Sequence, residues 1–277
     1  MDLEDLFTIK EYKVVGVDLP CFDAELRDLA VEEPLLERPS HIHIDIFCST
    51  AASTDWDLTG QILWPVSILL SHFVVSRPGQ DVVRGHNVVE LGAGCGLVGM
   101  AASYYCNEVV LTDGNEIVMD LLCKNAESKD NVSATAFTWG TRSELHAILE
   151  RVGCVDVVVA ADVVQWPTVV EPLLHSVKAL LWNSRCERPC LLLGIVNRAD
   201  NIYGYFFRVA KELGFACEKV QPKTFLKDGV IPKSCLEFGG WETEIFIVEL
   251  VDRSVDPKML GDGDDLVDQE NWLETNL

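Results

Sequence analysis

Glycine is concentrated in one short segment, which reads VVELGAGCGLVG and joins two apolar runs. Gly92, Ala93, Gly94 and Gly96 fall between the end of an expected strand and the start of an expected helix. Glycines at such a point let the backbone turn sharply, and without a Cβ they let a bound molecule approach the main chain. The spacing from Gly94 to Gly99 also matches the dinucleotide fingerprint. The segment therefore predicts a cofactor site.

A carboxylate follows the next expected strand. Asp113 lies 23 positions after Glu90, at the end of the run EVVLT. From there a carboxylate can accept hydrogen bonds from both ribose hydroxyls of an adenosine. The alternative interpretation is a helix N-cap, because residues 113–116 read DGNE and precede a helical pattern. Asp113 thus favours an adenosine-containing cofactor, and both NAD and S-adenosylmethionine meet that requirement.

Strands and helices alternate along the middle of the chain. A first helix is expected to begin near Trp64, because Pro65 is tolerated only in a first turn. The runs DVVVAA and CLLLGIV are apolar throughout, which is typical of parallel strands covered on both faces. The pattern predicts a Rossmann-like, doubly wound α/β fold. The expected strands are 87–91, 108–112, 133–139, 156–161 and 190–196, and the expected helices after the first are 97–105, 116–128, 169–182 and 202–213.

The last two expected strands help to decide between NAD and S-adenosylmethionine. Residues 216–220 and 244–250 are expected to be strands, and no helical pattern lies between them. Such strands can pair antiparallel, so a seven-stranded, mostly parallel sheet should finish in a C-terminal hairpin. An NAD enzyme would instead need a second mononucleotide-binding half. The hairpin and the position of Glu90 before the alternating glycines favour S-adenosylmethionine and leave an NAD oxidoreductase as an alternative.

Three regions are expected along the chain. Residues 1–57 form an N-terminal extension with an edge strand or hairpin, in which Ile42, Ile44 and Ile46 share one face. Residues 58–251 form the cofactor-binding domain, and the acidic tail 252–277 is expected to be disordered. His41 and His43 also share a face and could bind metal, but no third ligand is close in sequence. We therefore interpret them as a solvated strand face and predict no metal site.

Acidic residues outnumber basic ones by 44 to 22, which gives a net charge of −22. That charge repels nucleic acid and anionic membranes and attracts basic partners. The ten cysteines form no paired CxxC set and are expected to be reduced. No signal peptide and no apolar stretch of membrane-spanning length is recognised. These features predict an intracellular protein of the cytosol or nucleus, with its oligomeric state left open.

At this point the chain resembles the seven-strand S-adenosylmethionine-dependent methyltransferases, over about residues 58–250. Within them it is similar to the small non-histone protein-lysine methyltransferases of methyltransferase family sixteen. Gly60 to Trp64 looks like the family's glycine-x-x-x-tryptophan segment, and Trp139 looks like its tryptophan beside the adenine. The resemblance implies that Trp64 lies beside the methionine end of the cofactor and that Glu90 lies near its amino group.

The segment AADVVQWP, residues 160–167, resembles the family's aspartate-x-x-tyrosine motif. The resemblance implies that Ala161 borders the cofactor and that Asp162 captures and orients a lysine of a protein substrate with a basic region. Gln165 stands where tyrosine is usual, and Trp166 could supply the missing aromatic wall. This departure keeps two alternatives open, a small-molecule methyltransferase and a catalytically weak module that binds S-adenosylmethionine.

Overall fold

A computed structural model describes residues 12–21, 41–49, 56–236 and 240–258. Its centre is a seven-stranded sheet with strand order β5-β4-β3-β6-β7-β9-β8. The first five strands in that order are parallel, and β9 is antiparallel to both β7 and β8. The strands are β3 (Asn87–Leu91), β4 (Glu108–Asp113), β5 (Val132–Ala136), β6 (Val157–Ala161), β7 (Cys190–Val196), β8 (Phe215–Lys219) and β9 (Thr243–Leu250).

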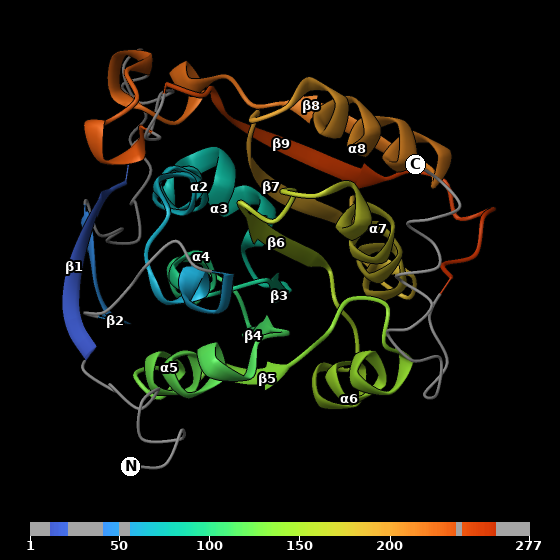
Figure 1. The fold of residues 1–277 in the computed structure, drawn as a ribbon, viewed down its shortest axis with the longest axis horizontal. Coiled ribbons are helices and arrows are strands. Elements are labelled where there is room, and N and C mark those ends of the chain that lie inside the picture. Colours follow the sequence, from blue (N-terminus) through green and yellow to red (C-terminus); the bar gives the residue numbers. More distant parts are fainter. Residues whose placement is uncertain (1–11, 22–40, 50–55, 237–239, 259–277) are drawn as a thin grey trace, which may run out of the picture.

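Helices cover both faces of this sheet, as Figure 1 shows. One apolar core, with Phe73, Met100 and Leu121, lies under the helices of the first face. A second core, with Leu173 and Phe206, lies under those of the other face. The first face carries α2 (Pro65–Val75), α3 (Arg77–Val83), α4 (Leu97–Ala102) and α5 (Glu116–Ala126), and the second carries α6 (Arg142–Val152), α7 (Pro167–Leu181) and α8 (Asp200–Glu212). The short 3₁₀ helices are η2 (Trp56–Gln61), η3 (Pro222–Thr224), η4 (Lys227–Gly229) and η5 (Lys233–Cys235).

The doubly wound sheet and its antiparallel end confirm the predicted fold class. The last strand in the chain, β9, lies inside the sheet, so β8 forms the edge. None of the helices among the described residues is long and apolar enough to cross a membrane.

Two predicted boundaries were wrong by three residues, others differed by one or two residues, and two helices were missed. The expected strand 133–139 ends at Ala136, so Trp139 lies in the loop beyond it, and the helix expected at 97–105 ends at Ala102. Helix α6 was missed although its apolar residues recur at helical spacing from Leu145 to Val152. Helix α3 was missed because its Pro-Gly pair reads as a chain breaker, although a proline is accepted in a first turn.

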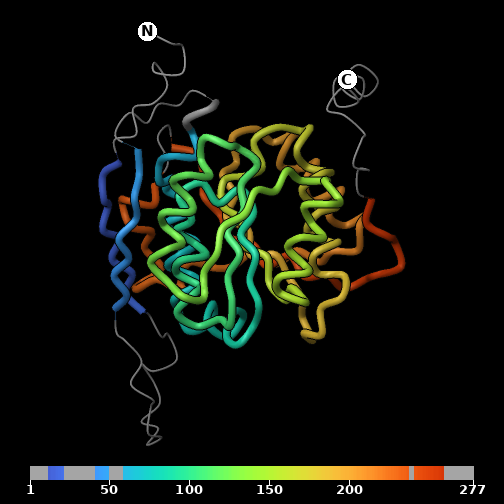
Figure 2. Tube along the Cα trace, turned by 90° about the horizontal axis from the view of Figure 1, so that it is seen from below, coloured from blue at the N-terminus to red at the C-terminus, as the bar shows by residue number. Residues whose placement is uncertain are grey.

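A separate two-stranded sheet covers the outside of the first helical layer (Figures 1 and 2). Strands β1 (Tyr12–Pro20) and β2 (His41–Ser49) pair antiparallel, and the predicted apolar face of β2 is buried. The side chain of Asn125 on α5 links this sheet to the domain. It accepts from the Phe47 amide at 2.8 Å and donates to the carbonyls of Phe47 at 3.1 Å and Cys95 at 2.9 Å. Of the tail 252–277, for which disorder was predicted, residues 259–277 lie outside the described residues.

Gly99 lies where α4 packs closely against the sheet. A Cβ on this residue would lie 2.3 Å from Leu111 Cδ2 and 2.7 Å from Glu90 Oε2. We expect Gly99→Ala to lower the free energy of unfolding by about 1–3 kcal/mol, because a well-packed core does not accommodate the added methyl group. Urea denaturation measures this change.

Gly204→Ala is the matched control. Gly204 is exposed on α8 with nothing within 4 Å of an added Cβ, so the substitution should raise stability by about 0.5–1 kcal/mol through helix propensity. Equal effects of the two substitutions would contradict the packing at Gly99.

Candidate active site

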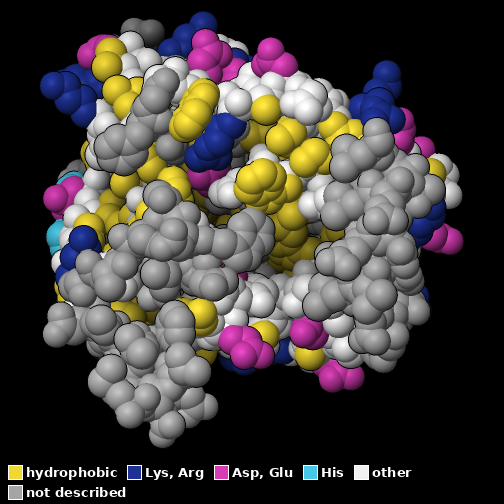
Figure 3. Space-filling model, in the orientation of Figure 1, with side chains coloured by type: hydrophobic (Ala, Val, Ile, Leu, Met, Phe, Trp, Pro, Cys, Tyr) yellow, Lys and Arg dark blue, Asp and Glu magenta, His cyan; other side chains and the backbone are white. Residues whose placement is uncertain are grey.

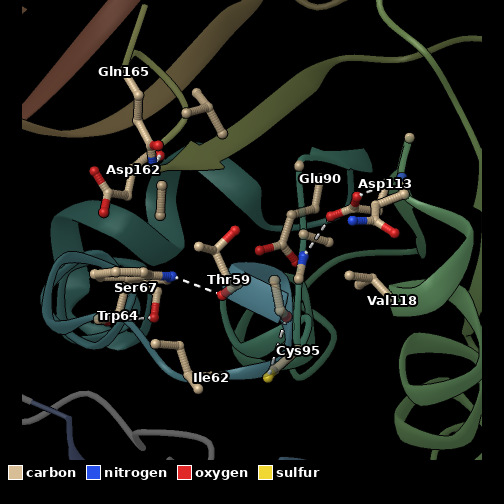
Figure 4. Close-up of a pocket in the computed structure, with 18 of the residues that line it drawn as sticks. Thr59, Ile62, Trp64, Ser67, Glu90, Cys95, Asp113, Val118, Asp162 and Gln165 are labelled. Atoms are coloured by element: carbon tan, nitrogen blue, oxygen red, sulfur yellow. Dashed lines mark hydrogen bonds between the residues drawn. The ribbon is translucent and has the colours of Figure 1, made fainter. Parts of the chain in front are cut away.

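A cavity of about 540 Å³ opens at the carboxyl ends of the parallel strands. Open α/β sheets bind ligands at this edge, and pockets of this volume accommodate small molecules. Figure 4 shows residues from η2, α2, the turn after β3, the end of β4 and the end of β6 around one space. The cavity gathers almost all of the predicted site residues, namely Trp64, Glu90, Gly92, Ala93, Gly94, Asp113, Trp139, Ala161, Asp162, Gln165 and Trp166.

The glycine turn after β3 forms the floor of this cavity. Gly92 has φ 61° and Gly94 has φ 54°, a region that side chains rarely adopt. A Cβ on Gly94 would lie 2.8 Å from the carbonyl oxygen of Gly60, and one on Gly92 would lie 2.8 Å from Val163. Gly96, also predicted to bind cofactor, is not among the lining residues and instead caps the start of α4. The turn is therefore shaped by both backbone conformation and close packing.

Asp113 fixes the shape of the turn from the neighbouring strand. Its Oδ2 accepts from the Gly94 amide at 2.9 Å, and its Oδ1 accepts from the Asn115 amide at 3.0 Å. The N-cap of α5 is Asn115, whose Oδ1 accepts from the Ile117 amide at 2.9 Å. Asp113 is therefore not the helix cap. Burial raises the pKa of its carboxyl group, and the group borders the cavity.

Glu90 is a second carboxyl group at the same edge, 2% exposed at the end of β3. Its Oε2 accepts from the Gly99 amide at 2.7 Å. Burial raises the pKa of Glu90 to about 8, against the weaker opposing effect of the backbone hydrogen bonds. Glu90 and Asp113 therefore border one cavity with two poorly solvated carboxyl groups, which suits a ligand that carries a cation and hydroxyl groups.

Asp162 lies at the opposite side of the cavity, just after β6 (Figure 4). It is 6% exposed and has φ 59°, which is uncommon for any residue but glycine. Both of its carboxylate oxygens accept from the guanidinium group of Arg198, with Nη2 at 2.8 Å from Oδ2. Gln165 donates from Nε2 to the Asp162 carbonyl at 2.9 Å, so its side chain supports the loop that carries this carboxylate.

Arg198 was not predicted from the sequence. It follows β7 and so lies at the same sheet edge as the predicted residues, which is the only signal that could have indicated it. Its guanidinium carbon lies 5.9 Å from the ring centroid of Trp64 and 5.6 Å from that of Trp241. An arginine held by two indole rings and a carboxylate has a restricted orientation.

The three predicted tryptophans occupy different parts of the site. Trp64 donates from Nε1 to the Thr59 carbonyl at 3.0 Å, which fixes its ring at the cavity wall. Trp139 packs close to Gly92, so that a Cβ on that glycine would lie 3.1 Å from the indole. Trp166 is 50% exposed and precedes α7, so it lies at the rim. Lining residues that the sequence reasoning missed include Thr59, Val118 and Phe137.

Comparison with known proteins identifies this arrangement. A family model described as lysine methyltransferase matches residues 50–212. The chain belongs to the lysine methyltransferase family. This confirms the resemblance found in the sequence, and the matched residues include the glycine turn, Asp113, Asp162 and Arg198.

Curated relatives of the family match part of the chain. The calmodulin-lysine N-methyltransferase of Arabidopsis thaliana is 32% identical over 134 residues, which are 45% of this chain and 42% of that protein. The protein-lysine N-methyltransferase EFM3 of Saccharomyces cerevisiae is 27% identical over 190 residues, 61% of this chain and 52% of that protein. The chain thus spans about half the length of the curated relatives it matches.

Solved structures share the fold at low sequence identity. The branched-chain polyamine synthase of Thermus thermophilus, crystallised with N4-aminopropylspermidine and 5'-methylthioadenosine, is 16% identical with a TM-score of 0.51. The match covers 72% of this chain and 60% of the synthase. At this identity the likeness supports the fold alone.

The burial of Glu90 generates a testable titration. We expect one glutamate carboxyl resonance in the NMR spectrum to titrate with a midpoint of about 8, and to be absent from Glu90→Gln. Because the folded pKa exceeds the ordinary value, the contribution of Glu90 to stability falls as the pH rises from about 4 to about 8. The exposed-surface control Glu150→Gln should keep the resonance, and titration of every glutamate below about pH 6 would contradict the burial.

Proposed function

We propose that the protein is an S-adenosylmethionine-dependent methyltransferase that methylates the side-chain nitrogen of a lysine in a protein substrate. The observation that carries this proposal is a single cavity that holds Asp113 and Glu90 on one side and Asp162 on the other. Asp113 and Glu90 suit an adenosine and an amino-acid group, and Asp162 suits a lysine. Membership of the lysine methyltransferase family supports the same assignment.

The residues present fit the cofactor. Gly92 and Gly94 line the cavity without side chains, so a ligand can approach their backbone, and the cavity volume is that of a small-molecule pocket. Asp113 would accept from the ribose hydroxyls, Glu90 would pair with the ammonium group, and Trp139 would wall the adenine. S-adenosylmethionine, when bound, supplies an electrophilic methyl group for in-line displacement by an amine.

The enzyme residues must then deliver a neutral amine. At pH 7 the deprotonation of a lysine side chain with an ordinary pKa costs about 4–5 kcal/mol. Asp162 would capture the arriving ammonium group, because a carboxylate has about four lone-pair positions and Arg198 occupies one on each oxygen. The positive charge of Arg198 lies beside the captured group and favours loss of its proton to water. Asp162 therefore orients the lysine, and Arg198 positions Asp162 and lowers the cost of deprotonation.

Charge and cysteine chemistry support the proposed substrate and location. The net charge of −22 supports a basic region around the target lysine and disfavours a nucleic-acid substrate. The ten free cysteines support action in the cytosol or the nucleus, where thiols stay reduced.

Two observations favour a second function, a module that binds S-adenosylmethionine without turnover. Arg198 already pairs with the carboxylate that a lysine would need, and Gln165 replaces the aromatic ring of the family motif. A module of this kind would bind the cofactor and transfer no methyl group. The experiment below separates the two functions.

Incubation with labelled S-adenosylmethionine and cell extract tests the proposal. We expect a labelled protein band whose label is on lysine. Asp162→Asn should lower the rate of labelling at least about 100-fold, because a neutral amide cannot form an ion pair with an ammonium group. Asparagine tolerates the positive φ of this position, so the variant should fold and still bind cofactor. Label in the small-molecule fraction would indicate the small-molecule alternative.

Two further variants sharpen this assay. Asp130→Asn changes an exposed aspartate away from the cavity and should leave the label unchanged. Arg198→Gln should move the rise of the pH–rate profile upward by about one unit, because the positive charge that favours deprotonation is lost. Cofactor binding without label on any substrate pool would refute methyl transfer and support the binding module.

A further inference from the structure

The outward face of the β1–β2 sheet brings together residues that are far apart in sequence. The antiparallel register pairs Asp18 with His43 and places His41 opposite Pro20. Residues that alternate with these, such as Leu19 and Ile42, point inward and are buried. Because side chains alternate across a strand, Asp18, His41 and His43 all point outward. Figure 3 shows histidine side chains next to an acidic one at the left edge of the molecule, where Figure 1 places this sheet.

Three atoms of this face that can bind a metal ion lie close together. Asp18 Oδ1 lies 2.9 Å from His41 Nε2 and 2.6 Å from His43 Nδ1, and the three atoms all lie within 4.8 Å of one another. In a tetrahedral zinc site with bonds of 2.0–2.1 Å, ligand atoms are about 3.3 Å apart. The third ligand that the sequence did not indicate is therefore Asp18, supplied by the partner strand.

Two neighbours hold His43 in place. Its Nε2 lies 3.2 Å from Asp45 Oδ1, so the ring nitrogen that does not face Asp18 has its own carboxylate partner. Such an outer carboxylate fixes the tautomer and orientation of a metal-binding histidine. Gly16, opposite Asp45, leaves the space for the ring, because a Cβ there would lie 2.8 Å from His43 Cε1.

We propose that Asp18, His41 and His43 form a zinc-binding site on the N-terminal sheet, with solvent in the fourth coordination position. Two imidazoles and one carboxylate are a ligand set that Zn²⁺ accepts, and they disfavour Mg²⁺ and Ca²⁺, which prefer oxygen ligands. The bound ion joins β1 to β2 across the 20 residues between Pro20 and His41. The site is separate from the cavity and does not depend on the proposed methyl transfer.

Calorimetric titration of the untagged full-length protein with ZnCl₂ tests the site. We expect saturable binding with one ion per chain at this site. Asp18→Asn and His43→Gln should each weaken it at least about 100-fold, and Asp45→Asn should weaken it about 10-fold, as loss of an outer carboxylate does. His146→Gln, a change of an exposed histidine on α6, should leave the affinity unchanged.

Two independent measurements distinguish this site from zinc binding by cysteine thiols and from an effect of misfolding. Zn²⁺ should raise the Tm of the wild-type protein and of His146→Gln, but not that of Asp18→Asn, because only folded chains with the site gain binding energy. The Co²⁺-substituted wild type should show a nitrogen and oxygen ligand set. Zinc affinity that is unchanged in Asp18→Asn and His43→Gln, a thiolate-to-cobalt absorption band, or no saturable binding would each overturn the proposal.

Discussion

The pairing of the Asp113 carboxylate with the amides of Gly94 and Asn115 determines how the site is built. It holds the glycine turn after β3 against the start of α5, which are two segments from different βα units. The turn can adopt its backbone conformation only because Gly92 and Gly94 carry no side chain. The floor of the cavity therefore depends on one carboxylate whose two oxygens fix the loops on either side of it.

The two ends of the cavity differ in their electrostatics. Glu90 is buried because β3 is central in the sheet, and its partner is the Gly99 amide rather than a basic side chain. Its pKa is therefore raised, and a cationic group entering the cavity would relieve the cost of its ionisation. On the opposite side, Asp162 is compensated by Arg198, so the two ends of the cavity present different charge to a ligand. The cavity therefore holds an ion-paired carboxylate at one end and a carboxyl group bonded to a backbone amide at the other.

Local features of the sequence predicted the parts of the site that depend on local geometry. The glycine turn, Asp113 at the end of β4 and the start of α2 after Trp64 follow from residue type and strand ends, and the structure has them at the cavity. Arg198 could not be assigned, because its partner Asp162 lies 36 residues away and only strand order brings them together. Helix α6, by contrast, was missed although its apolar residues recur at helical spacing, so the sequence held the signal for it.

The N-terminal sheet illustrates the same limit. The alternation of His41 and His43 was visible in the sequence, but the position of Asp18 opposite them depends on the register of a strand that the sequence did not locate. Register is a property of the folded hairpin and its buried face, so a third ligand from another strand cannot be found by counting along one segment. Cross-strand contacts are thus where the structure adds most to the sequence.

Calorimetric binding of S-adenosylhomocysteine to the full chain tests the central claim most directly. The account predicts one site per chain, an affinity at least about 100-fold weaker in Asp113→Asn because two hydrogen bonds to a charged group are impaired, and no binding of NADH. Asp130→Asn, which changes an exposed aspartate away from the cavity, should bind like the wild type. Binding of NADH in place of S-adenosylhomocysteine, or an Asp113→Asn variant that binds as well as the wild type, would contradict it.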